Sequence, residues 1–245
     1  MSRVTRNGAT RNGATRNGVS RNGATRNGAK KESDLDMNID KVKINMTFET
    51  ITTFEKRLSN FFGSKHAICV DSCTHGLELV LRYRNEKKII VPKRTYLSVP
   101  FLANKLNIER EWKDENWEDF YAINDGDRKI IDAAVLWEEN SYIPNTFMCI
   151  SFQYQKHLSL GRGGVILLDN DEDALILKKM SYDGRVPNLP WREQNIDCVG
   201  YHYYMTPETA KLGLDKIDDA IKNKPKKWKV SDWPDLTEMK IFKNI

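Results

Sequence analysis

The chain has 245 residues and a formal net charge of +5, and residues 1–31 carry six Arg and two Lys without a single acid. The remaining residues have a formal charge of −3, so the basic composition gives no evidence that a folded part binds a polyanion. No apolar run approaches the ~18 residues of a membrane span, and the basic N-terminus lacks the apolar core of a secretory signal.

A pentapeptide repeat fills residues 5–29, which read TRNGA, TRNGA, TRNGV, SRNGA and TRNGA. Ala and one Val are its only apolar side chains, and its period of five matches neither a helix nor a strand. We therefore expect residues 1–32 to be a disordered basic tail. Such a tail could contact nucleic acid, but it lacks interleaved aromatic residues, and a merely solvated segment is the favoured interpretation.

Apolar periodicity beyond the tail predicts strands alternating with helices. A first helix is expected over 48–62, ended by Gly63. Further strands are expected over 66–70, 88–91, 130–134, 147–152 and 165–168, and further helices over 76–83, 99–106 and 171–180. Thr206 and Pro207 open a last helix as N-cap and first-turn proline. This order predicts an α/β fold with a largely parallel sheet flanked by helices.

The cysteines and histidines argue against disulfides and metal sites. The four cysteines form no CxxC pair, and three lie in or beside apolar strand-like runs. We expect reduced, buried thiols in a cytoplasmic protein. The four histidines show no metal-ligand spacing. Residues 33–224 are expected to form one α/β domain, followed by a short remnant over 225–245.

Lys156 lies between two predicted buried strands, close to the glycine-rich stretch Gly161–Gly164. A lysine on such a turn can lie against the core, where desolvation lowers the proton affinity of its ammonium group. The free amine is then a nucleophile suited to Schiff-base chemistry. On the local sequence alone, a solvated loop lysine remains the alternative.

The spacing Ser151-Phe152-x-x-x-Lys156-x-Leu158-x-x-Gly161-x-Gly163-Gly164 resembles the cofactor-lysine segment of a known family. This is the DegT/DnrJ/EryC1/StrS family of pyridoxal 5′-phosphate (PLP) aminotransferases, which act on nucleotide-linked keto sugars. The resemblance covers most of residues 48–223. It implies a PLP-dependent transferase fold with an aspartate-aminotransferase-like large domain and a small C-terminal domain that is largely missing. It also implies that Lys156 forms the internal aldimine and then moves a proton as general base and acid.

A candidate phosphate site lies at Cys73-Thr74, where a strand and turn lead into a helix. Backbone amides at a helix N-terminus, together with a threonine hydroxyl, suit an anion. Alone this signal is weak, because any strand-turn-helix unit offers such amides. The family has Gly-Thr or Ala-Thr here, and the resemblance implies that Cys73, Thr74 and Ser151 contact the cofactor phosphate.

Asp132 ends an apolar strand, where a carboxylate is costly unless it has a partner. It could cap a turn. The resemblance to the family's Asp-Ala-Ala instead implies an ion pair with the protonated ring nitrogen, worth about 4 kcal/mol at ~4 Å and an effective dielectric near ~20. That pair makes the ring an electron sink. Tyr96 is implied to stack on the ring, although a tyrosine packed at a helix start fits the local sequence equally well.

The segment Gly200–Met205 resembles one that reaches the neighbouring subunit's cofactor in the family, which implies a homodimer. Several residues depart from the family pattern: Val135 replaces a glutamine, Arg162 an acidic residue, His202 an asparagine and Tyr204 an arginine. Only a short polar connection joins Asp114 to Asp132, where the family has a strand-helix unit. These departures do not affect the candidate lysine, aspartate or phosphate site, so cofactor attachment is expected. Whether the chain turns over a substrate is left open.

Two hypotheses of different class follow. In the first, the chain is a reduced aminotransferase that moves an amino group from glutamate or glutamine to a nucleotide-linked keto sugar. In the second, it is a scaffold that keeps the fold for binding or assembly. A sugar dehydratase relative is a weaker third hypothesis, because those members have histidine in place of this lysine.

Overall fold

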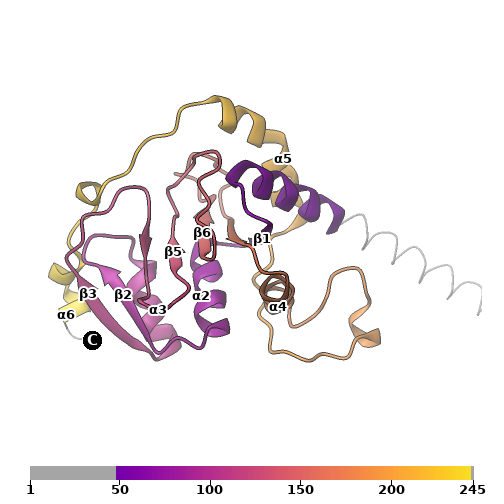
Figure 1. The fold of residues 1–245 in the computed structure, drawn as a ribbon, viewed down its shortest axis with the longest axis horizontal. Coiled ribbons are helices and arrows are strands. Elements are labelled where there is room, and N and C mark those ends of the chain that lie inside the picture. The colour runs from indigo at the N-terminus through magenta and orange to yellow at the C-terminus, as the bar shows by residue number, and fades with distance from the viewer. Residues whose placement is uncertain (1–47, 244–245) are drawn as a thin grey trace, which may run out of the picture. The chain divides into compact units, whose positions relative to one another are not determined.

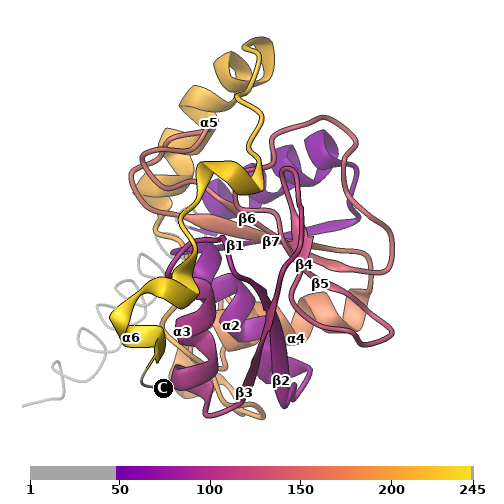
Figure 2. The same ribbon diagram turned by 90° about the vertical axis from the view of Figure 1, so that its left-hand side faces the viewer.

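The computed structural model describes residues 48–243 (Figures 1 and 2). The predicted tail over 1–32 lies outside the described residues. The helix over 48–62 is present as predicted, and no described helix is both long and apolar enough to cross a membrane. The four cysteines are free, and three of them are buried as expected.

The central sheet has five strands in the order β1-β7-β6-β5-β4. Their bounds are β1 His66–Val70, β4 Tyr121–Ala122, β5 Ile130–Asp132, β6 Phe147–Ser151 and β7 Gly164–Leu168. β5 and β6 pair in parallel, whereas the pairs β1–β7, β6–β7 and β4–β5 are antiparallel. The α/β class is confirmed, but the sheet is mixed, not largely parallel. A parallel return from β6 would need a crossover helix, and the connection to β7 instead carries the turn with Lys156.

A second, two-stranded sheet pairs β2 (Lys88–Pro92) in parallel with β3 (Glu109–Lys113). Helix α3 (Ser98–Leu106) makes the crossover between them. β3 was not predicted, because its sequence EREWK contains no apolar run and its residues alternate between exposed and half-buried. The sheets are linked where the Ile90 amide donates to the Ile123 carbonyl at 2.9 Å.

Helices cover both faces of the central sheet, and the alternation of side chains along each strand builds two cores (Figure 1). On β6, Met148 and Ile150 pack with the helix over 48–62 and with α5 (Pro207–Lys222). Phe147 and Cys149 point the other way, toward α2 (Cys73–Tyr83) and α4 (Asp171–Ser181). The strand is buried on both faces, which explains its uninterrupted apolar run.

Two helix starts follow from side-chain caps. Thr206 caps α5 as predicted, its side chain accepting from the Thr209 amide. Helix α2 begins at Cys73, three residues before the predicted start, because the Ser72 hydroxyl accepts from the His75 amide at 3.2 Å. The Cys73-Thr74 pair therefore belongs to the first turn of the helix.

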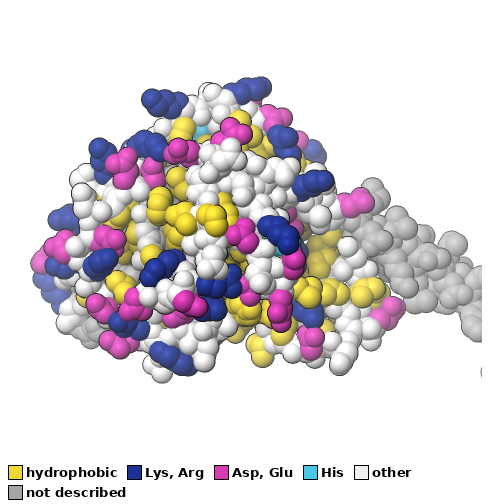
Figure 3. Space-filling view, viewed as in Figure 1, with side chains coloured by type: hydrophobic (Ala, Val, Ile, Leu, Met, Phe, Trp, Pro, Cys, Tyr) yellow, Lys and Arg dark blue, Asp and Glu magenta, His cyan; other side chains and the backbone are white. Residues whose placement is uncertain are grey.

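The C-terminal segment runs back along the domain from the end of α5 past α3, as the yellow ribbon in Figure 2 shows. It contains the short helices η2 (Val230–Asp232), η3 (Leu236–Glu238) and α6 (Lys240–Lys243), whereas η1 (Trp191–Glu193) lies upstream of α5. Leu236 and Phe242 are buried. The Phe242 ring packs on Phe101 at a centroid distance of 5.1 Å. Lysines, arginines and acids are interspersed on the face shown in Figure 3, around an apolar patch.

Candidate functional site

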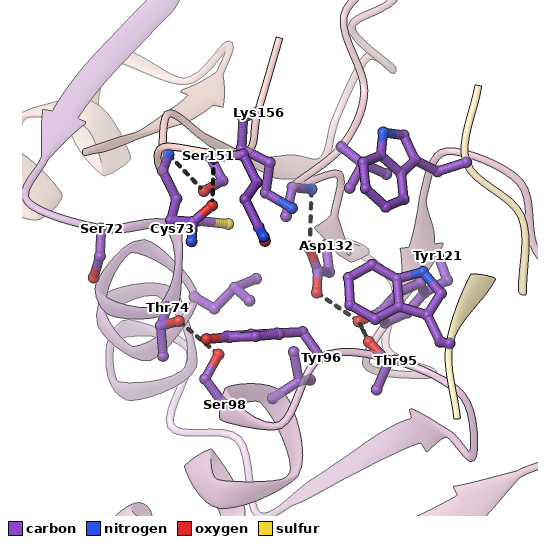
Figure 4. Close-up of a pocket in the computed structure, with 18 of the residues that line it drawn as sticks. Ser72, Cys73, Thr74, Thr95, Tyr96, Ser98, Tyr121, Asp132, Ser151 and Lys156 are labelled. Atoms are coloured by element: carbon purple, nitrogen blue, oxygen red, sulfur yellow. Dashed lines mark hydrogen bonds between the residues drawn. The ribbon is translucent and has the colours of Figure 1, made fainter. Parts of the chain in front are cut away.

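One cavity of about 510 Å³ lies between α2, the start of α3, the ends of β5 and β6, and the C-terminal segment. Its volume lies in the range usual for small-molecule sites. The six predicted site residues all line it: Cys73, Thr74, Tyr96, Asp132, Ser151 and Lys156 (Figure 4). The structure therefore brings together every residue that the sequence singled out for the site.

Lys156 stands on the tight connection between β6 and β7. Its amide donates to the Gln153 carbonyl at 2.8 Å, and the Phe152 amide donates to the Gly163 carbonyl at 2.9 Å. Gly161 and Gly163 have φ of +79° and +150°, conformations that explain the glycines of the motif. The side chain is half-buried. Burial lowers the pKa of Lys156, opposed by the charges of Asp132 and Cys73, which agrees with the interpretation of a desolvated amine.

Asp132, at the end of β5, is 5% exposed, and both of its carboxylate oxygens accept hydrogen bonds. Oδ1 accepts from the Ala134 amide at 3.0 Å, which is the turn cap considered as the alternative. Oδ2 accepts from the Tyr121 hydroxyl at 2.5 Å. Burial raises the pKa of Asp132, and these two hydrogen bonds together with the charge of Lys156 lower it.

Tyr121 is a site residue that the sequence analysis missed. It lies opposite Asp132 in the β4–β5 pairing, and its hydroxyl also bonds to the Thr95 hydroxyl. The strand β4 has two residues and no recognisable pattern. The one available signal was an aromatic residue eleven positions before the candidate aspartate, which is too general to assign a role.

Hydroxyl groups gather at the start of α2. The Thr74 hydroxyl bonds to the Ser98 hydroxyl at 2.7 Å, and the Ser151 hydroxyl accepts from the Gln153 amide at 3.3 Å. The Cys73 thiol donates to the Cys149 carbonyl at 3.4 Å. Burial raises the pKa of this thiol.

Gly164 lets β7 approach this helix start closely. A Cβ atom at Gly164 would lie 2.4 Å from the Cys73 nitrogen, closer than such atoms can come. The second glycine of the Gly-Gly pair is therefore required by packing against the first turn of α2, since only a residue without a side chain fits there.

Lys156 and Tyr96 lie on opposite sides of the open space in Figure 4, with Asp132 at its edge. The Tyr96 ring is 55% exposed, so a face of it is available to a ligand. Three tryptophans that the sequence analysis did not single out complete the wall: Trp117, Trp228 and Trp233. Two of them come from the segment that was expected to be a remnant.

The residues that depart from the family pattern are held within this chain. Arg162 pairs with Asp71 at 2.7 Å at the cavity edge, and Val135 lines the cavity. His202 pairs with Asp183 at 3.1 Å. Over the described residues, the cavity wall contains none from 199–206.

The sequence matches the model of the DegT/DnrJ/EryC1/StrS aminotransferase family over residues 28–114 and 144–233. The chain belongs to this family, and the resemblance drawn from its motifs is confirmed. Asp132 lies between the two matched ranges, so its assignment depends on the cavity geometry described above.

Individual relatives are distant. An uncharacterised protein of Methanocaldococcus jannaschii is 24% identical over 77% of this chain and 62% of its own length. Spr1654 of Streptococcus pneumoniae in its PLP form is 18% identical, with a TM-score of 0.59 over 71% of this chain and 60% of that one. PseC of Helicobacter pylori, an aminotransferase of pseudaminic acid biosynthesis, is 15% identical, with a TM-score of 0.58 over 70% and 58%. The chain thus has the fold of PLP-dependent aminotransferases and spans about 60% of these relatives' length.

The donor set of the cavity fits PLP. Hydroxyls and first-turn amides at the start of α2 suit its phosphate, and the buried Asp132 suits a protonated ring nitrogen. The half-buried amine of Lys156 lines the same cavity.

Proposed function

We propose that this chain binds PLP covalently through Lys156 and transfers an amino group from glutamate or glutamine to a nucleotide-linked keto sugar. The observation that carries the proposal is the convergence of Lys156, Asp132 and the α2 helix start on one cavity. The family match and the PLP form of a structure with the same fold support the cofactor. The pathway of PseC supports a sugar substrate.

The residues have distinct roles in this proposal. PLP, when bound, supplies an electron sink for carbon acid chemistry. The Asp132 carboxylate holds the ring-nitrogen proton, and the first turn of α2 with Thr74 and Ser151 holds the phosphate. The face of Tyr96 orients the ring. Lys156 Nζ attaches the cofactor and then accepts and returns a proton as general base and acid.

A scaffold role is the second candidate, and one observation favours it. His202, at a position where the family has another residue, contacts Asp183 inside this chain, and Arg162 forms an ion pair with Asp71. Both side chains therefore have a partner within this chain, although Arg162 also lines the cavity. The two candidates differ in whether amino-group transfer occurs.

The proposal includes a homodimer in the cytoplasm. The motivation for the dimer is the Gly200–Met205 segment, whose family counterpart reaches the partner's cofactor. The motivation for the location is the set of four free cysteines. Sedimentation of the PLP-loaded protein tests the assembly, and a strictly monomeric protein that binds PLP tightly would contradict it.

Covalent attachment is tested by borohydride reduction of the protein purified with PLP, followed by peptide mapping. The protein should be yellow, and the reduced label should lie on the peptide containing Lys156. The variant Lys156→Ala should lose colour and label. Lys211→Ala removes a solvent-exposed lysine on α5 and should keep both. A label on another lysine, or no colour at saturating PLP, would end the proposal.

Amino-group transfer is tested in two half-reactions, each of which is monitored by single-turnover absorption spectra. Glutamate or glutamine should convert the bound cofactor to its amine form, and a nucleotide-linked keto sugar is added next. We expect the first step to be faster, because positioning a large substrate can supply about 7–11 kcal/mol and needs more surrounding wall. No reaction in either half would favour the scaffold.

A further inference from the structure

Two indole rings of the C-terminal segment lie beside the candidate lysine. Lys156 Nζ is 5.5 Å from the ring centroid of Trp228 and 5.8 Å from that of Trp233. Both distances are within the ~6 Å over which an ammonium interacts with an aromatic face. Both rings line the cavity. The amine is therefore bordered by aromatic surface on the side of the C-terminal segment.

Trp228 is fixed by Asp119, a 6% exposed residue on the connection before β4. The Asp119 amide donates to the Trp228 carbonyl at 2.9 Å, and Asp119 Oδ1 accepts from the Trp228 amide at 3.1 Å. Its other oxygen pairs with Lys227 Nζ at 2.9 Å. Asp119 adopts this arrangement with a φ of 62°, in the left-handed region that aspartate tolerates better than most residues.

Trp233 is fixed by the peptide that follows β2. Arg94 donates to the Trp233 carbonyl at 3.0 Å, and the Leu236 amide donates to the Lys93 carbonyl at 2.8 Å. The Trp117 indole N–H donates to the Arg94 carbonyl at 2.9 Å. This hydrogen bond joins the connection that holds Trp228 to the peptide that holds Trp233. The segment from Trp228 to Leu236 is thus tied at both ends to the domain that carries Lys156.

We propose that Trp228 and Trp233 are positioning residues for Lys156, and that their rings hold its amine at the cavity and keep water from it. The charged or titratable groups that line the same cavity as the amine are Asp132, Cys73, Arg162, Asp119, Tyr96 and Tyr121, and Lys226 Nζ lies 3.8 Å from the ring centroid of Trp228. Burial is the largest influence on the amine and lowers its pKa, while Asp132 and Cys73 oppose it. The rings supply apolar surface without adding a charge.

This inference rests on the proposed function, in which Lys156 attaches the cofactor. Its test measures the pKa of the Lys156 amine in protein that contains no cofactor. Cofactor-free protein is reductively methylated with ¹³C-formaldehyde, and the Lys156 signal, assigned with Lys156→Arg, is titrated by NMR. In Trp228→Ala/Trp233→Ala, water reaches the amine and the pKa of Lys156 should rise toward the ordinary lysine value. Trp228→Phe/Trp233→Phe keeps the aromatic cover and should stay close to the wild type. Trp191→Ala, a 52% exposed tryptophan outside the cavity, is the matched control.

Thermal unfolding shows whether each variant is folded, so that a changed titration of Lys156 can be told apart from a general loss of structure. If the double alanine variant does not fold, the single variants Trp228→Ala and Trp233→Ala decide, and each should shift the titration in the same direction. A folded alanine variant that titrates like the wild type would overturn the inference, even if borohydride still labels Lys156. A ring-dependent titration without any labelling by PLP would support the inference and end the proposed function.

Discussion

The Tyr121 hydroxyl donates to Asp132 Oδ2 at 2.5 Å, across the β4–β5 strand pair in which the two residues lie opposite each other. The Thr95 hydroxyl bonds to the same phenol. Because Asp132 is buried, this hydrogen bond, the one from the Ala134 amide and the charge of Lys156 are the interactions that favour its charged form. The orientation of the carboxylate is therefore set from a strand that contributes no predicted site residue.

Tyr121→Phe keeps the ring and removes the donor to Asp132. Burial then acts with one less opposing hydrogen bond, so the pKa of Asp132 should rise further. Loss of a buried hydrogen bond to a charged group should lower the free energy of unfolding by about 1–3 kcal/mol. Urea unfolding and NMR titration of the Asp132 carboxyl measure the two effects.

Tyr83→Phe is the matched control for this prediction. The Tyr83 hydroxyl donates to Asp173 at 2.5 Å, outside the cavity wall. This variant should lose a similar amount of stability and leave the Asp132 titration unchanged. Equal titrations of Asp132 in Tyr121→Phe and the wild type would show that Tyr121 does not act on the carboxyl.

Asp132→Asn should make the cofactor-free protein more stable at neutral pH. The folded-state pKa of Asp132 is raised above its ordinary value, so the folded state binds this proton more tightly than the unfolded state does. The resulting stabilisation is complete below the ordinary pKa near ~3.9 and is lost as the pH rises through the raised value. The unfolding free energies of the wild type and Asp132→Asn should therefore converge at low pH and separate as the pH rises through the raised pKa of Asp132.

The same variant tests the role of Asp132 toward the cofactor. Asp132→Asn should retain the covalent attachment at Lys156, since the amine is untouched, but it should stall the half-reaction with an amino donor. Single-turnover spectra at saturating PLP measure this. An unchanged half-reaction rate would remove Asp132 from the site.

Gly164→Ala should disrupt the start of α2. The added Cβ would meet the Cys73 nitrogen at 2.4 Å and the Ser72 carbonyl carbon at 2.7 Å, and backbone atoms of a helix turn cannot give way easily. We expect a loss at or above the upper end of the about 1–3 kcal/mol typical of overpacking, together with weaker PLP binding. In Gly126→Ala the nearest atom is a side-chain nitrogen, and the loss should stay below about 1 kcal/mol.

The pentapeptide repeat should be dispensable for folding, because its side chains can bury almost no apolar surface. A protein that begins at Asp34 should keep the melting temperature of the full chain within error. Differential scanning calorimetry of the two proteins checks this. A drop of several degrees would mean that the repeat docks on the domain.

Elements with strong apolar periodicity were predictable from the sequence, among them β6, β7, α4 and α5. Those built by pairing or by tertiary contact were not. The strand β3 is polar and exists because it pairs with β2, and β4 has two residues that pair with β5. The sheet was predicted to be largely parallel and is mixed, because the turn that carries Lys156, although itself predicted, brings β7 back antiparallel to β6.

The site was predictable where it rests on a local motif, and less so where it depends on distant segments. Lys156 and Ser151 stand five residues apart on one connection, so their spacing is visible in the sequence. Tyr121 and Trp233 reach the cavity through pairing and packing that no local pattern encodes. Their roles are predictions from the structure alone.

Gly164 pairs with Ser151 on one side and with Val70 on the other, two residues before the cap of α2. The spacing between Lys156 and the start of α2 is consequently set by one hairpin and its neighbouring strand, without any contribution from the chain between β3 and β5. Insertions or deletions in that intervening chain can change its length while the lysine and the anion end of the cavity keep their separation. The family match breaks off over this same part of the chain, between residues 114 and 144. Length changes in this part of the chain should therefore leave that separation unchanged, provided that Trp117, Asp119 and Tyr121 keep their places in the cavity wall.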